Sequence, residues 1–269
     1  MSLSRVKISN HLRTSIIGSE IRLFGICTST NQIALDAAKE GAPEGLVVVA
    51  ETQTAGRGRQ RRLWHSPSGK NLYFSVLLRP QCPQARLPQL AMVAALALHQ
   101  ALRKVAPELD IGLKWPNDLW LNGQKLSGIL CECPPQSGER RAIVVGVGLN
   151  VNARREDFPP ELQETATSLA IAAGHDFDRT TLLAELLNAF GELYINWFNS
   201  KDLELFLSTW EKADILRGRT ITVVRPTDQL EGVVLGITAT GLLRLEVPGQ
   251  SEVVVSAGDV HIRKIQDKP

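Results

Sequence analysis

The segment 46–78 reads LVVVAETQTAGRGRQRRLWHSPSGKNLYFSVLL. Its first residues, Leu46 to Ala50, are apolar and typical of a buried strand, and strand character returns from Asn71 to Leu78. Between them, residues 52–70 contain three glycines and one proline and show neither a helical nor a strand period. A segment of this length without regular structure, inside a compact domain, is usually functional. The segment therefore predicts two strands that are joined by a long functional loop.

The sequence on both sides of this segment contains patterns of helices and of strands. Helical apolar spacing predicts helices at 31–40, 84–105, 180–199 and 201–214. Thr30 or Asn31 is the expected N-cap of the first of these helices. Val- and Leu-rich runs predict strands at 111–115, 119–121, 126–133 and 142–150, with Asn122-Gly123 as a hairpin turn. We expect an α+β fold, with a mixed sheet flanked by helices, rather than a doubly wound fold.

The sequence changes character after Gly218. Short Val- and Leu-rich runs follow one another, separated by Gly or Pro turns, at 220–224, 232–237, 242–246 and 252–255. This pattern predicts a small β-barrel or sandwich. We therefore divide the chain into an N-terminal extension (1–13), a main domain (14–216) and a small C-terminal domain (217–269).

Charge is distributed unevenly along the chain. The 30 Lys and Arg residues against 28 Asp and Glu give a net charge of +2, which is too near neutrality for a protein that mainly holds nucleic acid by its phosphates. Between Glu51 and Glu108, however, there is no acidic residue, while nine Lys and Arg residues occur. One electropositive segment in an otherwise acidic chain is suited to a compact anionic ligand.

Other features exclude several classes of protein. The longest apolar run, Leu90 to Leu98, is about half as long as a membrane span requires. The first residues lack the apolar core of a secretory signal, and four cysteines in 269 residues do not make a disulfide framework, so we expect a cytoplasmic protein. Cys131 and Cys133 would share one face of a strand, but no further soft ligand lies nearby in the sequence, so zinc is the minor alternative there.

Three short segments contain residues suited to binding or catalysis. Gly56-Arg57-Gly58-Arg59 can turn backbone N–H groups and guanidinium groups toward one anion, or it can be a solvated basic loop. Lys114-Trp115-Pro116-Asn117-Asp118 combines a cation, a ring and a carboxylate, or it is a turn in which Asn and Asp cap their own backbone. Lys125 lies just after the hairpin turn, where an exposed lysine would be commonplace.

Together these and other segments resemble the biotin protein ligase family. The resemblance extends from about Thr14 to the C-terminus and is dense over 28–150 and thin afterwards. Order and spacing both agree for the following segments: Thr28-Ser29-Thr30-Asn31, Gln53 to Arg59 continuing to Arg62 and Trp64, Asn71-Leu72-Tyr73, Lys114 to Asp118, Lys125 to Leu130, and Gly146 to Asn150.

The resemblance implies a two-step reaction. Biotin and ATP form biotinyl-5′-adenylate, and a lysine of a biotin carboxyl carrier domain then takes the biotinyl group. By the family's pattern the catalytic residues include Arg57 and Lys125, and Asp118 is our candidate for orienting Lys125 or for accepting a proton from the incoming lysine. Biotin would be bound by Ser29, Thr30, Asn31, Gln53, Gly56, Arg57, Gly58, Arg59, Lys125 and Gly128. ATP and the adenylate would be bound by Arg59, Arg62, Trp64, Lys114, Asn117 and Asn150.

The resemblance also implies a class II synthetase-like catalytic domain and an SH3-like C-terminal barrel, in which Arg263 is of interest. Mg²⁺ is expected with the triphosphate, without a metal-binding motif of the protein's own. Only about a dozen residues precede the region of resemblance, so we expect a ligase without a DNA-binding domain. Such a ligase is expected to bind neither operator DNA nor a membrane. A homodimer formed through a sheet edge is plausible.

Two other functions remain open from the sequence. A lipoate or octanoyl ligase shares the architecture and the acceptor lysine, although the Gly-Arg-Gly-Arg loop with Trp64 favours biotin. A nucleic-acid-binding module could use the basic stretch 57–104, although the acidic remainder and the scarcity of aromatic residues argue against it. Residues 54–66 are expected to be poorly ordered without ligand and to become ordered with biotin or its adenylate, because a mixed anhydride needs protection from water.

Overall fold

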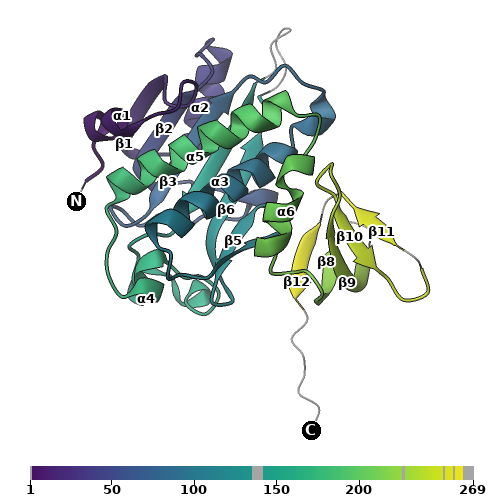
Figure 1. Ribbon diagram of the computed structural model, residues 1–269. Helices are drawn as coiled ribbons and strands as arrows, with labels where there is room; N and C mark the ends of the chain where they lie inside the picture. The colour runs from purple at the N-terminus through teal and green to yellow at the C-terminus, as the bar shows by residue number, and fades with distance from the viewer. Residues whose placement is uncertain (1, 135–141, 226–227, 251, 257, 263–269) are drawn as a thin grey trace.

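A seven-stranded mixed sheet forms the centre of the larger part of the molecule (Figure 1). The computed structural model describes residues 2–134, 142–225, 228–250, 252–256 and 258–262. The strand order is β1-β2-β3-β7-β6-β5-β4; only the β1–β2 pair is parallel and the other pairs are antiparallel. The expected α+β class is therefore confirmed. The strands are β1 (Glu20–Cys27), β2 (Leu46–Gln53), β3 (Leu72–Leu78), β4 (Ile111–Lys114), β5 (Asp118–Leu121), β6 (Gln124–Glu132) and β7 (Ile143–Leu149).

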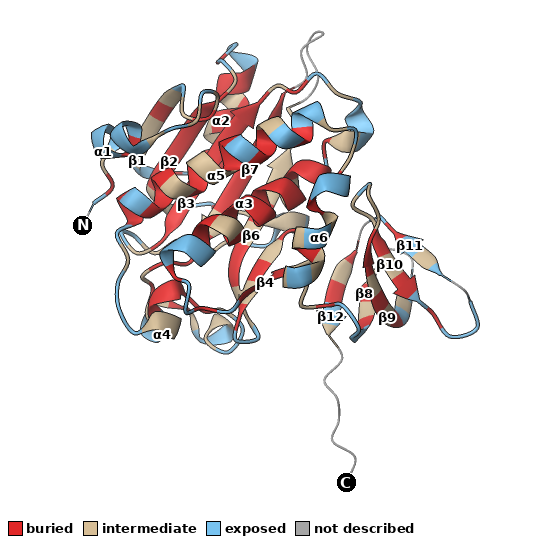
Figure 2. Ribbon diagram, viewed as in Figure 1, coloured by how far each residue is buried: buried red, intermediate tan, exposed pale blue. Residues whose placement is uncertain are grey.

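Two long helices, α3 (Gln89–Val105) and α5 (Arg179–Asn199), cover one face of the sheet (Figures 1 and 2). Their Ala- and Leu-rich faces pack on each other and on alternate strand residues such as Val47 and Val49. The prediction of a helix from residue 84 was wrong in its first turn. Residues Gln84–Arg86 form a 3₁₀ turn and α3 begins after Pro88, because a proline is not tolerated inside a helix.

The short helix α2 (Thr30–Lys39) packs on the opposite face, against β2, β3 and β7. Its alanines pack against the strand side chains that point to this second face, including Val48, Leu77 and Val144. The expected N-cap was wrong. Ser29 is the cap, without a capping bond from its side chain, and the Thr30 backbone N–H instead donates to Gln53 Oε1 at 2.9 Å. A side chain from the end of β2 thus accepts a hydrogen bond from a backbone N–H group at the start of the helix.

Two α-helices and two strands in the described part of the chain were not predicted from the sequence. The helix α1 (Arg5–His11), within the expected N-terminal extension, packs on α5 and β1 through the fully buried Ile8. Strand β1 has no regular alternation of apolar residues, and its exposed end includes Ile26. The other two missed elements are α4 (Leu169–Ala173) and β12 (Asp259–Ile262), both very short.

A five-stranded antiparallel sheet forms the separate C-terminal part, with the order β11-β10-β9-β8-β12 (Figure 1). The small SH3-like β-structure expected there is confirmed. Trp115 Nε1–H donates to Gly241 O at 2.9 Å and the Leu203 backbone N–H donates to Ala239 O at 2.8 Å, which seats the β9–β10 turn on the larger part. Helix α6 (Glu204–Ala213) leads into strands β8 (Thr220–Val224), β9 (Gln229–Ile237), β10 (Leu243–Glu246) and β11 (Val253–Val255).

No helix in the described part of the chain is both long and apolar enough to cross a membrane.

Candidate active site

A trough of glycines runs across β6 and β7 on the sheet face that α2 covers only in part. Gly128 and Gly148 are cross-strand partners, and the Trp64 ring lies over both. A Cβ added at Gly148 would lie 2.3 Å from Trp64 Cε2, and one added at Gly146 would lie 1.9 Å from Asn31 Oδ1. Side chains at these positions would displace both residues, so the glycines make room for Trp64 and Asn31 on the sheet.

The basic loop, residues 54–66, folds back on itself above this trough. The loop follows β2 in the sequence. At its start, the Thr54 backbone N–H donates to Cys27 O, at the end of the neighbouring strand β1, at 2.9 Å. Arg57 and Leu63 form an isolated antiparallel bridge, with a 3₁₀ turn at Arg59–Arg61 between them. The expected absence of regular structure over 52–70 was therefore wrong in part, because β2 continues to Gln53 and the loop is a short, irregular hairpin.

Polar side chains gather at the N-terminus of α2. Ser75 of β3 contacts Thr30 Oγ1 at 2.8 Å and Asn31 Oδ1 at 2.6 Å through its hydroxyl group. Gln53 Nε2–H donates to Ser66 Oγ at 3.3 Å, which ties the end of the basic loop to the same cluster. Ser29, Thr30 and Asn31 are all buried. The structure thus brings the residues expected to bind the biotin ring into one small polar group.

Arg57 pairs with a residue that sequence reasoning missed, Glu132 at the end of β6. The closest N···O separation between them is 3.2 Å, and Arg57 also donates to Gln32 Oε1 at 3.3 Å. Asn31 Nδ2–H donates to Glu132 Oε2 at 2.7 Å. Glu132 therefore joins the basic loop to the start of α2.

Lys125 and Asp118 form the second charged pair of the site. Lys125 Nζ–H donates to Asp118 Oδ2 at 2.7 Å, and the ammonium group lies 5.8 Å from the centroid of the Trp64 ring. The other oxygen, Asp118 Oδ1, is buried with no hydrogen-bond partner among the described residues, and the same holds for Trp64 Nε1. These two orphaned polar atoms, one an acceptor and one a donor, border the glycine trough and suit a polar ligand.

Lys114 lies beside this pair, because it is the cross-strand partner of Asp118. Its ammonium group lies 4.1 Å from the centroid of the Trp120 ring. Burial lowers the pKa of Lys114, while the negative charge of Asp118 opposes that shift. Two ammonium groups thus flank one carboxylate.

The arginines at the tip of the basic loop reach toward the C-terminal sheet. Arg59 Nη1–H donates to Asn117 Oδ1 at 3.4 Å, and its Nη2–H donates to Gly258 O at 3.4 Å. Arg62 pairs with Asp259 at the start of β12. A path from the α2 N-terminus to the C-terminal sheet is therefore lined by the cations Arg57, Arg59, Arg62 and Lys125.

Comparison with known proteins agrees with this arrangement. Residues 23–150 match the biotin/lipoate A/B protein ligase family, and residues 217–263 match the biotin protein ligase C-terminal domain. The bifunctional ligase/repressor BirA of Bacillus subtilis is 36% identical over 255 residues, which cover 95% of this chain and 78% of that protein. This chain is a member of the biotin protein ligase family. A biotin–[acetyl-CoA-carboxylase] ligase of Mycobacterium tuberculosis is 34% identical, and the match covers 94% of both chains.

A solved structure of this family has the same fold. The biotin protein ligase from Aquifex aeolicus, in complex with biotin and ATP, superposes with a TM-score of 0.80 at 28% sequence identity. The match covers 91% of this chain and 99% of that one.

Most of the site residues expected in this biotin protein ligase family member lie together, and the side chain of Asn150 is bound by buried neighbours. It is buried; its Oδ1 accepts from Asn71 and its Nδ2–H donates to Thr167 O at 3.0 Å. Its amide thus holds the loop after β7. Asn117 also has an internal role, since its Nδ2–H donates to Ile129 O at 2.5 Å, while its Oδ1 faces Arg59. Arg263 lies outside the described residues.

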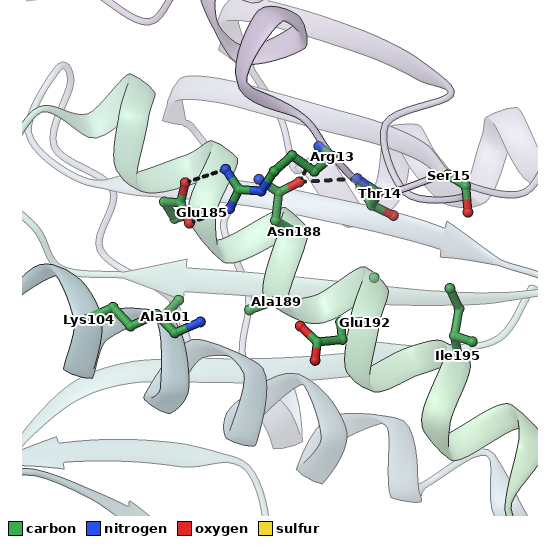
Figure 3. A pocket seen from close by; sticks show the side chains of 11 residues that line it. Arg13, Thr14, Ser15, Ala101, Lys104, Glu185, Asn188, Ala189, Glu192 and Ile195 are labelled. Atoms are coloured by element: carbon green, nitrogen blue, oxygen red, sulfur yellow. Dashed lines mark hydrogen bonds and ion pairs between the residues drawn. The ribbon is translucent and has the colours of Figure 1, made fainter.

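The described residues include no group of three or more His, Cys, Asp or Glu side chains that could hold a metal ion. A pocket of about 300 Å³ lies elsewhere, between the segment 13–15 and helices α3 and α5 (Figure 3). Arg13 donates to both carboxylate oxygens of Glu185 at its edge. Because α3 and α5 cover the other face of the sheet, this pocket is not part of the candidate active site.

Proposed function

We propose that this chain activates biotin with ATP to biotinyl-5′-AMP and then transfers the biotinyl group to a lysine of a biotin carboxyl carrier domain. The observation that carries the proposal is the juxtaposition of Arg57, Arg59 and Lys125 around a glycine trough. In the first step a biotin carboxylate oxygen attacks the α-phosphorus of ATP and pyrophosphate leaves. Two anions must meet, so the site has to neutralise both and hold them in line.

The buried polar group at the start of α2 would bind the biotin ring. Thr30 already donates to Gln53, and Asn31 donates to Glu132, so the orientations of these side chains are set before the ligand arrives. Ser29 lies at the same helix terminus, where backbone N–H groups and the helix dipole favour an acceptor such as a ring carbonyl. Gly56 allows the loop to approach closely, because an added Cβ would lie 2.8 Å from Trp64 O.

Lys125 would bridge the biotin carboxylate and the α-phosphate. Its pairing with Asp118 orients the ammonium group and leaves its other hydrogens for the reacting oxygens. Arg57 and Gly58 would contact the carboxylate side of biotin, and Arg59, Arg62 and Lys114 the phosphates. Trp64 would cover the adenylate. ATP would arrive as its magnesium complex, since phosphate oxygens supply ligands to this hard ion and few protein carboxylates are needed.

In the second step the neutral amine of the acceptor lysine attacks the acyl carbon, an amide forms and AMP leaves with the bonding electron pair. Asp118 Oδ1, which is buried without a partner in the described part of the chain, is placed to accept the proton that the amine loses. The basic loop would shield the mixed anhydride from water until the carrier domain arrives. Biotin is favoured over lipoate, since the named relatives are ligases of biotin.

The test is to incubate the protein with ATP, Mg²⁺, biotin and a carrier domain and to measure the mass of the carrier. We expect one added biotinyl group, which disappears when the acceptor lysine is replaced by arginine. Lipoate in place of biotin should give no added mass. Modification by lipoate but not by biotin would contradict the proposal.

A further inference from the structure

The basic loop touches the C-terminal sheet where β12 begins. Arg62 donates to the carboxylate of Asp259, and Arg59 donates to the neighbouring carbonyl oxygen of Gly258. The Asp259 side chain is 15% exposed and that of Arg62 is 65% exposed. A mostly buried carboxylate of the C-terminal sheet is thus paired with a solvent-exposed arginine of the loop.

Asp259 also acts on a second cation of the site. Its negative charge raises the pKa of Lys114 against the lowering effect of burial, as Asp118 does more strongly. Arg62 and Lys114 are both residues that the proposed function assigns to the nucleotide phosphates. One carboxylate of this chain therefore faces two cations that would otherwise meet phosphate oxygens.

The C-terminal sheet does not depend on this contact for its position. The β9–β10 turn is fixed by hydrogen bonds to Trp115 and to Leu203, at Gly241 and Ala239. Within its own sheet, Asp259 is the backbone partner of Val224 at one end of the β8–β12 ladder. The Arg62–Asp259 pair is therefore free to break and to form again while the sheet remains seated.

We propose that Asp259 is a positioning residue that holds Arg62 in the nucleotide-free enzyme and competes with the polyphosphate of ATP for it. This inference rests on the proposed function, which assigns Arg62 and Lys114 to ATP. Binding of the triphosphate then exchanges a carboxylate for phosphate oxygens at Arg62 and releases the loop tip from β12. Asp259 thereby lowers the affinity for nucleotide.

The first test compares Asp259→Asn with wild type in calorimetric titrations with ATP and with inorganic tripolyphosphate. The substitution keeps the shape of the side chain and removes its charge. We therefore expect about two- to fivefold tighter binding of both ligands, the effect of one partly exposed ion pair. Glu252→Gln is the matched control, since Glu252 pairs with Arg244 near β11 at the other end of the same sheet. Unchanged or weaker binding in Asp259→Asn would overturn the inference.

The second test asks whether the effect acts through Arg62. In an Arg62→Ala background, Asp259→Asn should tighten tripolyphosphate binding by much less than in wild type, because the competing pair is already gone. An undiminished gain would mean that Asp259 acts by general repulsion, and the inference would be wrong. Tripolyphosphate binding needs no biotin chemistry, so failure of carrier biotinylation would count against the proposed function alone.

Discussion

Lys125 and Arg57 lie on the same face of the sheet but have different partners. Lys125 pairs with Asp118 within the sheet, whereas Arg57 reaches Glu132 from the loop. Lys125→Ala should therefore slow adenylate formation by about a hundredfold, the usual cost of losing one electrostatic stabiliser of the reacting centre. Arg57→Ala should mainly weaken retention of the adenylate, with release about tenfold faster. Single-turnover formation and release of biotinyl-5′-AMP separate the two effects.

Two nearby residues serve as controls. Lys70 pairs with Asp157 at 3.3 Å, outside the glycine trough, and Arg61 is exposed in the same loop as Arg57. Lys70→Ala and Arg61→Ala should leave both rates close to those of wild type. If Lys125→Ala and Arg57→Ala also kept full activity, our assignment of the site would be wrong.

Glu132 is expected to position Arg57 and Asn31 rather than to touch a reacting atom. Glu132→Gln removes the charge that Arg57 pairs with, and we expect the KM for biotin to rise about tenfold with a smaller change in kcat. Glu20→Gln, which affects an exposed pair with Arg22 in β1, is the control. A change in kcat alone would contradict a positioning role.

The sequence predicted which site residues lie together where they belong to one short motif. It did not predict contacts between residues that are far apart in the chain. Arg57, Arg59 and Gln53 lie within one short segment, so their proximity follows from the sequence. Glu132 lies 75 positions after Arg57, and its role arises only because β6 brings it to the start of α2. The Asn150 amide shows the converse, since the motif gives no sign of the buried partners that its side chain has in the structure.

The glycine trough determines how the basic loop packs on the sheet. Gly148→Ala places a methyl group where the Trp64 ring now lies, so we expect the ring and the loop to be displaced. Limited proteolysis with trypsin should cleave after the loop arginines several times faster than in wild type. Biotin should restore less protection than it gives the wild-type loop.

Gly25→Ala is the matched control, because an added Cβ at Gly25 meets nothing within 4 Å. Its cleavage rate should equal that of wild type. Equal cleavage of Gly148→Ala and Gly25→Ala would show that Trp64 does not hold the loop down. For wild type, cleavage of residues 54–66 at the same rate with and without biotin would contradict the expected ligand-dependent ordering.

Long elements with a clear period were predicted well, and an element without one was missed. Helix α5 was expected at 180–199 and is Arg179–Asn199, because its apolar spacing persists over many turns. Strand β1 escaped notice because it lies at the edge of the sheet, where only one neighbour constrains its pattern. Edge pairing into a homodimer stays a prediction.

Asp214 lies at the connection between the two parts of the molecule, where it forms a parallel bridge with Leu113. Burial raises its pKa from 3.8 to about 6. The native state therefore holds this proton more tightly than the unfolded chain, and its contribution to stability falls as pH rises between about 4 and 6. We expect the free energy of unfolding of Asp214→Asn, measured with urea, to rise by ~1–3 kcal/mol relative to that of wild type between pH 4 and pH 7. Parallel pH profiles of the two proteins would contradict this.

The two-part organisation was predictable from the change in composition near Gly218, but the contact between the parts was not. Hydrogen bonds from Trp115 to Gly241 and from Arg59 to Gly258 join residues more than a hundred positions apart. Strand β12, which carries Asp259, was itself not predicted because its sequence, Asp-Val-His-Ile, is not a Val- or Leu-rich run. The domain limits 1–13, 14–216 and 217–269 stay predictions.

The central claim is that clustered cations allow the carboxylate of biotin to attack the α-phosphate of ATP. Biotin-dependent exchange of labelled pyrophosphate into ATP measures that step without a carrier domain. We predict that the purified protein catalyses this exchange with Mg²⁺ and biotin, and that omission of biotin abolishes it. No exchange above the biotin-free background, in a protein that is folded and binds ATP, would contradict the account.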